Sequence, residues 1–158
     1  MKENNWLYNG KPINILEDFP KDTYGFIYEV EHIPTQRKYL GKKVLYFIRN
    51  KKLGKKELEI LKEERKQKGL RGKTPTKKQI TIESDWKNYY GSHKEILNLI
   101  KQGKQSEFKR NILQFVFSKK LLTYYETKYL FMYEVLENPK IYLNSNILGK
   151  FFQSDFIS

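Results

Sequence analysis

The chain has 158 residues, which fits one compact domain, and its aromatic and aliphatic content is sufficient for a hydrophobic core. It contains no cysteine and two histidines, so disulfide bridges and thiolate metal sites are excluded and a zinc site is disfavoured. The formal net charge of +13 favours a polyanionic partner, and since no stretch is long and apolar enough to span a membrane, we expect a cytoplasmic location without a membrane partner.

The N-terminal part of the chain predicts extended structure. Residues 6–15 are typical of a short hairpin whose turn is Asn9-Gly10, the preferred pair for a two-residue loop. Residues 25–30 form an aromatic and β-branched run without helical period, which indicates a buried strand. A second strand is expected from Lys38 toward Phe47, and the short connection predicts an antiparallel pair.

The middle of the chain is strongly basic. Residues 53–69 are rich in Lys, Glu and Leu and predict a largely solvated helix that stops at Gly69. Residues 70–82 lack an apolar period, so we expect a basic loop that is mobile until DNA orders it. An AT-rich genome could raise the lysine content of the whole chain, but it does not explain why basic residues outnumber acidic ones by more than two to one between Arg37 and Lys78.

Two helices and a third strand are expected in the second half. Ser84 is predicted to cap a short helix, and Ser92 with Glu95 has capping-box spacing before a helix that ends at Gly103. Residues 108–117 alternate as a core strand, and Ser118 precedes the longest helix, at about 119–136. Residues 138–158 give mixed signals.

These elements predict an α+β fold. Its centre is a small antiparallel three-stranded β-sheet flanked by helices, with an N-terminal β-hairpin as an extension. The predicted boundaries are 1–22 for the hairpin extension, 23–149 for the sheet-and-helix domain with a basic insertion at about 50–82, and 150–158 for a C-terminal tail.

Several stretches resemble the GIY-YIG nuclease superfamily, and in particular its freestanding phage members. Gly25-Phe26-Ile27-Tyr28 is followed by Tyr39-Leu40-Gly41, with eleven residues from one tyrosine to the other. These two motifs alone would be weak, because strands are rich in Tyr and turns in Gly. Residues 6–11, 83–92, 108–113 and 125–128 extend the resemblance over nearly the whole chain. It implies an endonuclease with one divalent ion, Mg²⁺ or Mn²⁺, per active site.

The resemblance assigns Glu126 as the only protein ligand of that metal. Glu126 lies beside the apolar stripe of the longest predicted helix, where a carboxylate needs a partner, and pairing with a nearby lysine is the alternative. A single carboxylate suits Mg²⁺, which fills its remaining positions with water and phosphate oxygen.

The resemblance also gives roles to the two tyrosines. Tyr28 is implicated in activating the attacking water, and Tyr39 in positioning water or phosphate. Without the resemblance both would be interpreted as strand residues on half-buried faces. A free phenol titrates near pH 10, so its use as a base at pH 7 costs about 4 kcal/mol unless a cation or a metal-bound water lowers that cost.

The transition state of phosphodiester hydrolysis needs a cation against the scissile phosphate. Many superfamily members carry an arginine about ten residues after the second tyrosine, and Arg49 has that spacing but is predicted at a strand end instead of on a helix. Lys42 and Lys43, directly after Gly41, could supply the cation instead, and Lys38 beside Tyr39 is a further candidate. We assign this role jointly to Lys43 and Arg49, and each could equally be a phosphate contact or a solvated charge. The residues expected to bind DNA are Lys38, Lys42, Arg71, Lys73, Lys77, Lys78, Trp86 and His93.

Three of the candidate residues have open alternatives. Asn144 resembles a C-terminal asparagine that braces the active site by hydrogen bonds, and a plain turn asparagine is the alternative. His93 could move a proton or contact a phosphate, although a single surface histidine more often does neither. Trp86 could belong to the core or approach DNA.

The predicted function is metal-dependent hydrolysis of double-stranded DNA by a phage-encoded nuclease, serving homing or competition between genomes. One active site per chain means that cutting both strands requires a homodimer on DNA, sequential nicking or reorientation. The rival hypothesis is a non-catalytic basic nucleic-acid-binding protein that retains the nuclease fold.

Overall fold

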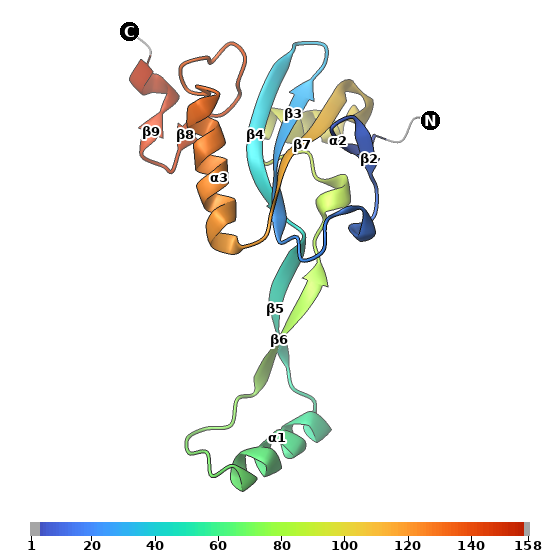
Figure 1. Cartoon of the computed structure of the whole chain (residues 1–158), viewed down its shortest axis with the longest axis vertical. Helices are drawn as coiled ribbons and strands as arrows, with labels where there is room; N and C mark the ends of the chain where they lie inside the picture. The colour runs from blue at the N-terminus through green and yellow to red at the C-terminus, as the bar shows by residue number, and fades with distance from the viewer. Residues whose placement is uncertain (1–3, 157–158) are drawn as a thin grey trace. The chain divides into compact units, whose positions relative to one another are not determined.

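The computed structural model describes residues 4–156, and the chain divides into two compact units (Figure 1). The inserted unit is Tyr46–Ser84, and the main unit comprises the residues up to Leu45 and from Asp85 onward. Residues 1–3 and 157–158, which the sequence assigned to the hairpin extension and the tail, lie outside the described residues. None of the helices within residues 4–156 combines the length and apolar character that a membrane crossing requires.

The main unit is built on a five-stranded sheet with the order β2-β1-β7-β3-β4. Its centre is antiparallel, because β3 (Gly25–His32) pairs with both β4 (Arg37–Val44) and β7 (Phe108–Val116). The N-terminal hairpin of β1 (Trp6–Tyr8) and β2 (Lys11–Ile13) joins this sheet through a parallel pairing of β1 with β7.

The predicted α+β class is confirmed, but the predicted three-stranded antiparallel sheet is not. The sheet is mixed and five-stranded, since the hairpin is part of it instead of a separate extension. The physical reason is that three strands alone would leave one edge of β7 without backbone partners, and β1 covers that edge.

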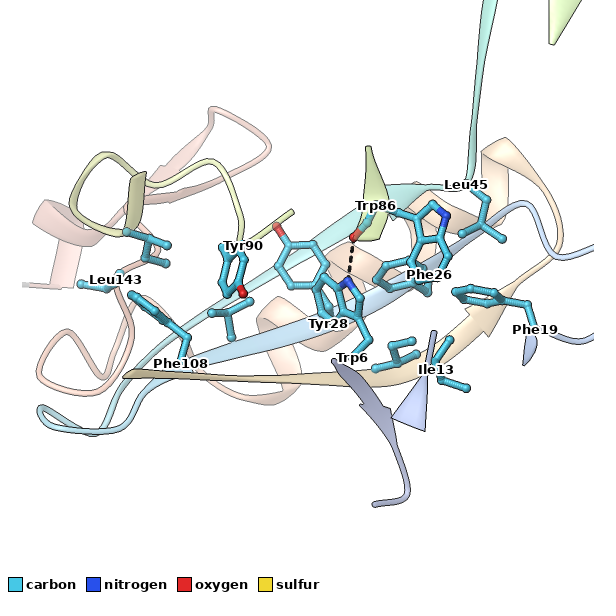
Figure 2. Packing of buried hydrophobic residues seen from close by; sticks show 13 residues of the cluster. Trp6, Ile13, Phe19, Phe26, Tyr28, Leu45, Trp86, Tyr90, Phe108 and Leu143 are labelled. Carbon is cyan, nitrogen blue, oxygen red and sulfur yellow. Dashed lines mark hydrogen bonds between the residues drawn. The ribbon is translucent and has the colours of Figure 1, made fainter. Parts of the chain in front are cut away.

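Side chains alternate along β3, so its two faces contribute to two hydrophobic clusters. Phe26 and Tyr28 lie on one face and pack with Trp6 and Trp86, as Figure 2 shows. Ile27 lies on the opposite face, in the cluster that includes residues of α3 (Lys119–Met132).

The helices follow the same division between the two faces. α2 (Lys94–Lys101) contributes Ile96 to the first cluster, and α3 contributes Leu122 and Leu130 to the second. The cap of α2 is His93, whose Nδ1 accepts a hydrogen bond from the backbone N–H of Glu95, and not Ser92 as the sequence predicted.

Shorter elements connect the strands and helices. The 3₁₀ turns are η1 (Leu16–Asp18), η2 (Trp86–Asn88), η3 (Gln105–Glu107) and η4 (Gln153–Phe156). In the region of mixed sequence signals, β8 (Asn146–Ile147) and β9 (Phe151–Phe152) pair with each other. α3 ends at Met132, four residues earlier than predicted, and turns follow it.

Trp86 is a core residue, and its prediction as a DNA contact is wrong. Its exposed fraction is 0%, and its ring meets Phe19 edge-on with a centroid distance of 5.0 Å (Figure 2). Its carbonyl oxygen accepts a hydrogen bond of 2.7 Å from the Trp6 indole. An indole buried in this way cannot reach DNA, and the polar residues on either side of it in the sequence concealed its burial.

The inserted unit is an antiparallel ribbon with a helix. β5 (Tyr46–Lys52) pairs over its whole length with β6 (Lys77–Glu83), and α1 (Lys55–Gln67) lies between them in sequence. The strand predicted to run from Lys38 toward Phe47 is therefore two strands, and part of the predicted loop 70–82 is a strand. The high lysine content of residues 70–82 favoured a loop in the sequence analysis, although Ile80-Thr81-Ile82 is a β-branched run that favours a strand.

Candidate active site

Tyr28 packs directly across a glycine of the neighbouring strand. Tyr28 and Gly41 are cross-strand partners in the β3–β4 pair. A Cβ atom on Gly41 would lie 2.5 Å from the Tyr28 hydroxyl oxygen and 2.8 Å from its Cζ, so glycine is required at this position. The Tyr28 side chain is buried, and its ring centroid lies 6.5 Å from that of Tyr39. The two tyrosine motifs therefore form one packed unit.

The segment before α2 covers both tyrosines. Tyr89 is hydrogen bonded to the Tyr28 hydroxyl, and the two rings are nearly perpendicular with centroids 5.7 Å apart. The Ser92 hydroxyl lies 3.0 Å from that of Tyr39. Gly91 has φ of +104°, and a Cβ there would lie 3.1 Å from Cδ1 of Tyr39. The sequence did not single out Tyr89 or Gly91 as site residues, although a glycine after two tyrosines was an available signal.

Glu126 reaches the same place from α3. Its side chain is 22% exposed, and Oε1 lies 3.7 Å from Nζ of Lys42. Lys42 also donates a hydrogen bond of 2.9 Å to Oγ1 of Thr123, one turn earlier on α3. Burial raises the pKa of Glu126, and the smaller effect of Lys42 lowers it. The carboxylate is therefore incompletely compensated, which favours binding of a further cation.

Burial and neighbouring groups raise the pKa values of the two phenols. Burial is the main reason why the pKa of Tyr28 is well above its usual value, and Tyr89, Tyr39 and Glu126 raise it further. Burial also raises the pKa of Tyr39, against an opposing hydrogen bond from Ser92. Both phenols are therefore neutral at physiological pH, and neither is prepared to act as a base.

A pocket of about 420 Å³ lies where these elements meet. The polar and charged side chains that line it belong to Tyr39, Ser92, His93, Lys94, Glu126, Asn144, Ser145 and Asn146. The His93 ring lies 5.8 Å from that of Tyr39, between ring centroids. Tyr28 does not line the pocket. Lys94 is exposed at the first position of α2 and adds a cation that the sequence did not single out.

A larger pocket of about 750 Å³ shares none of these lining residues. It surrounds Arg110, which donates hydrogen bonds to the carbonyl oxygens of Asn4, Lys87 and Tyr89. Among residues 4–156 no carboxylate lines this larger pocket, and the Arg110 guanidinium already has structural partners, so the smaller pocket is the better candidate for a metal-binding site.

Asn144 braces the edge strand β4 next to the smaller pocket, the one that Tyr39 and Glu126 line. Its Oδ1 accepts a hydrogen bond of 3.0 Å from the Leu40 N–H, and its Nδ2 donates one of 2.8 Å to the Leu40 carbonyl oxygen. Lys38 makes two backbone hydrogen bonds on the same edge, with the carbonyl of Ile141 and the N–H of Leu143. Residues 141–144 thus supply hydrogen-bond partners for the outer edge of β4, as a neighbouring strand would.

Asn144→Ala is expected to lower the free energy of unfolding by about 1–3 kcal/mol, because the backbone groups of Leu40 lose their partners in a buried place. Urea denaturation measures the change. Ser145→Ala, at the exposed neighbouring position, is the control and should unfold like the wild type. An Asn144→Ala variant as stable as the control would contradict this bracing role.

Lys43 lies beside Tyr89 and not in the pocket. Its side chain is buried, and its Nζ lies 2.5 Å from Oδ1 of Asp85 and 4.0 Å from the centroid of the Tyr89 ring. Lys43 shares a strand face with Gly41 and Tyr39 because side chains alternate along β4. It therefore supports the ring that is hydrogen bonded to Tyr28.

Asp85→Asn is expected to lower the melting temperature at neutral pH. The hydrogen bond from Lys43 lowers the pKa of Asp85, against a smaller opposing effect of burial. This contribution to stability is present above the unfolded carboxyl pKa, about 3.9, and is lost as the pH falls through the lower folded value. Thermal unfolding from pH 7 downward should show the difference between wild type and variant shrinking in acid. A constant difference at all pH values would contradict the assignment.

The remaining predicted residues lie outside the pocket. Lys38 pairs with Glu29 across β3 and β4, with Nζ 3.4 Å from Oε1. The predicted residues that belong to the inserted unit are Arg49, Arg71, Lys73, Lys77 and Lys78. Among them, Arg49 lies over the Phe47 ring at 5.7 Å, and Lys78 pairs with Glu57 at 2.8 Å.

The pocket's donor set fits a hard divalent cation such as Mg²⁺ or Mn²⁺ better than a softer metal such as Zn²⁺. Within residues 4–156 there is no group of three or more His, Cys, Asp or Glu that could hold a metal. Glu126 is a partly exposed carboxylate on the pocket wall, surrounded by hydroxyl and amide oxygens. Mg²⁺ commonly takes one or two carboxylates and keeps several waters, so one carboxylate in a polar pocket is compatible with it.

Comparison with known families gives the context of this geometry. A family model described as "Putative endonuclease segE, GIY-YIG domain" matches residues 6–147. No curated protein and no solved structure matches the chain. The match covers the N-terminal hairpin, both tyrosine strands and α3. The chain therefore belongs to the SegE-type family of GIY-YIG nuclease domains.

Proposed function

We propose that this nuclease domain is a Mg²⁺- or Mn²⁺-dependent endonuclease that hydrolyses phosphodiester bonds in double-stranded DNA. The observation that carries the proposal is the convergence of Tyr39, Glu126 and Asn144 on one pocket, with Tyr28 packed behind it against Gly41. In this proposal Glu126 is the metal ligand and Tyr39 orients the attacking water. Asn144 holds the edge of β4, the strand that carries Tyr39.

Glu126 is the proposed metal ligand. A divalent ion bound there would stabilise the charge that develops on the phosphate and on the leaving oxygen. Lys42 offsets part of the carboxylate's charge at 3.7 Å, and we assign its ammonium as a contact for a phosphate bound beside Glu126. Lys94, at the pocket wall, is a second phosphate contact, and the two cations take the role for which Lys43 and Arg49 were candidates.

The phenols act as neutral hydrogen-bonding groups in this proposal. Deprotonating even an unperturbed phenol at pH 7 costs about 4 kcal/mol, and burial raises the pKa of both tyrosines further. Tyr39 orients the attacking water from the pocket wall, and Ser92 fixes its hydroxyl. Tyr28 holds the arrangement from behind through Tyr89. The proton of the attacking water passes to solvent or to a side chain of the pocket, where His93 supplies an imidazole.

The proposed biological role is that of a phage-encoded homing-type or genome-competition nuclease. It is supported by the resemblance of residues 6–11 and 83–92 to freestanding phage members. A site with one proposed metal ligand, Glu126, suits one strand cut per chain, so double-strand cleavage would involve a homodimer on DNA or two successive nicks.

Incubation with supercoiled plasmid at low salt tests the proposal. With Mg²⁺ we expect nicked or linear product, and with EDTA we expect none, because removing the divalent ion takes away its stabilisation of the transition state and leaves the negative charge of Glu126 beside the phosphate. Restoring Mg²⁺ should restore cutting. DNA binding without cutting under every condition would instead support a non-catalytic nucleic-acid-binding protein.

A further inference from the structure

The β5–β6 ribbon of the inserted unit has two chemically different faces. Cross-strand partners share a face, and successive pairs alternate between the two faces. One face carries Phe47 and Ile80, the only ribbon residues in β5 and β6 that are half-buried. The other face begins with the exposed pair Tyr46–Glu83 next to the main unit in sequence, and it continues with the exposed pairs Ile48–Thr81, Asn50–Gln79 and Lys52–Lys77, which we call the amide face.

The amide face has the chemistry needed to read base pairs. Asn and Gln side chains match the adenine edge in the major groove, because one amide group donates to N7 and accepts from the N6 amino group in a bidentate pair. Asn50 and Gln79 are direct cross-strand partners, so their side chains lie about 5 Å apart and can address one short site. Ile48, with 64% of its surface exposed, and Thr81 present methyl groups of the kind that contact the thymine methyl.

The shape and charge of the inserted unit fit the same partner. The major groove of B-DNA admits a two-stranded β-ribbon, whereas the major groove of A-form RNA is too deep and narrow for side chains to read. Tyr46–Ser84 contains 13 Lys and Arg residues and 5 Glu residues. Lys52 and Lys77 end the amide face, where they can contact the phosphates that flank a groove.

We propose that the amide face enters the major groove of duplex DNA and selects A·T base pairs, with Asn50 and Gln79 reading adenine. Ile48 and Thr81 contact thymine methyl groups, and Lys52 and Lys77 hold the flanking phosphates. The inference rests on the proposed DNA endonuclease function and adds to it a source of sequence preference within this chain.

Selection from short randomised DNA duplexes in EDTA, with the full-length protein, tests this inference. The wild type is expected to enrich A·T pairs at fixed positions. The double variant Asn50→Ala/Gln79→Ala should lose that enrichment by about tenfold or more at each position that an amide reads. Its binding to unselected duplex should keep the wild-type dependence on salt, since the phosphate contacts remain.

The matched control changes the next pair on the same face. Lys52→Ala/Lys77→Ala should weaken binding to all sequences alike, lower the slope of log affinity against log salt by about 2, and retain the A·T preference. The opposite signatures of the two variants distinguish loss of base reading from loss of the folded ribbon, which would remove both properties together.

Three outcomes would overturn the inference. The first is a wild type that enriches no base pair. The second is a double variant Asn50→Ala/Gln79→Ala that keeps the A·T preference or that loses affinity for every sequence alike. The third is duplex RNA that competes for binding as effectively as duplex DNA. A wild type that cuts plasmid but shows no preference overturns this inference alone. A wild type that selects A·T sites but never cuts contradicts the endonuclease proposal and leaves the DNA-reading surface standing.

Discussion

Glu126→Gln is expected to reduce Mg²⁺-dependent cleavage of supercoiled plasmid by about 1000-fold or more, with duplex binding in EDTA almost unchanged. The amide keeps the shape of the side chain but removes the charge that would hold the divalent ion. Metal stabilisation of a reacting phosphate contributes several kcal/mol, and each 1.36 kcal/mol is about one decade in rate. Gel quantification of nicked product over time, beside a binding titration, measures both effects.

Glu29→Gln is the matched control for this substitution. Glu29 is also a sheltered carboxylate paired with a lysine, with Oε1 3.4 Å from Nζ of Lys38, but it does not line the pocket. It should cut at close to the wild-type rate. Full activity of Glu126→Gln, or equal losses in both variants, would remove Glu126 from the metal-binding role.

Glu126→Gln should also raise the melting temperature of the metal-free protein at neutral pH. Burial raises the folded pKa of Glu126 by more than Lys42 lowers it, so the ionised carboxylate opposes folding. This penalty is complete above the folded pKa and disappears as the pH falls to the unfolded value, about 4.3. Thermal unfolding in EDTA should therefore show the variant's advantage shrinking in acid. A variant less stable than the wild type at neutral pH would show that the Lys42 pair outweighs desolvation.

Gly41→Ala is expected to lower cleavage by about 100-fold and the free energy of unfolding by about 1–3 kcal/mol. The added Cβ would meet the Tyr28 hydroxyl oxygen at 2.5 Å, so the phenol or the strand must move. A shift of about 1 Å in a group that positions reactants can cost about two decades in rate. Plasmid cleavage under saturating Mg²⁺ and urea denaturation measure the two losses.

Two further variants separate this clash from a general intolerance of alanine. Gly54→Ala adds a Cβ with no atom within 4 Å at a negative φ, and it should leave plasmid cleavage unchanged. Gly41→Ala/Tyr28→Phe removes the clashing oxygen and should recover part of the stability without recovering the activity. If the double variant loses as much stability as the single variants Gly41→Ala and Tyr28→Phe lose together, Gly41 and Tyr28 are not coupled.

The sequence predicted the parts of this fold that depend on local pattern. The strand at residues 25–30, the strand after Phe108 and the helix after Ser118 follow from alternation, caps and apolar stripes, and all three are present. The short connection between the two tyrosine strands predicted an antiparallel pair, which the register of Tyr28 with Gly41 confirms.

The missed features depend on contacts between distant segments. The parallel pairing of β1 with β7 joins Trp6 to Arg110, and no local pattern signals a partner so far along the chain. The burial of Trp86 depends on Phe19 and Trp6, and the hydrogen bond of Tyr89 to Tyr28 depends on how residues 85–93 cross the sheet. The position of Lys43 beside Asp85 and Tyr89, instead of in the pocket, depends on where residues 85–89 pack, which no local pattern signals.

The register of β5 with β6 has a consequence for how such a gene could change. Tyr46 and Glu83 are paired, so the inserted unit enters and leaves through strand ends about 5 Å apart. A tight turn could bridge that gap, and recombination could graft a different ribbon there without altering a residue of the pocket. If the two proposals hold, exchange of this inserted unit would change the bases that the protein reads and would leave Glu126 and the rest of the pocket unchanged.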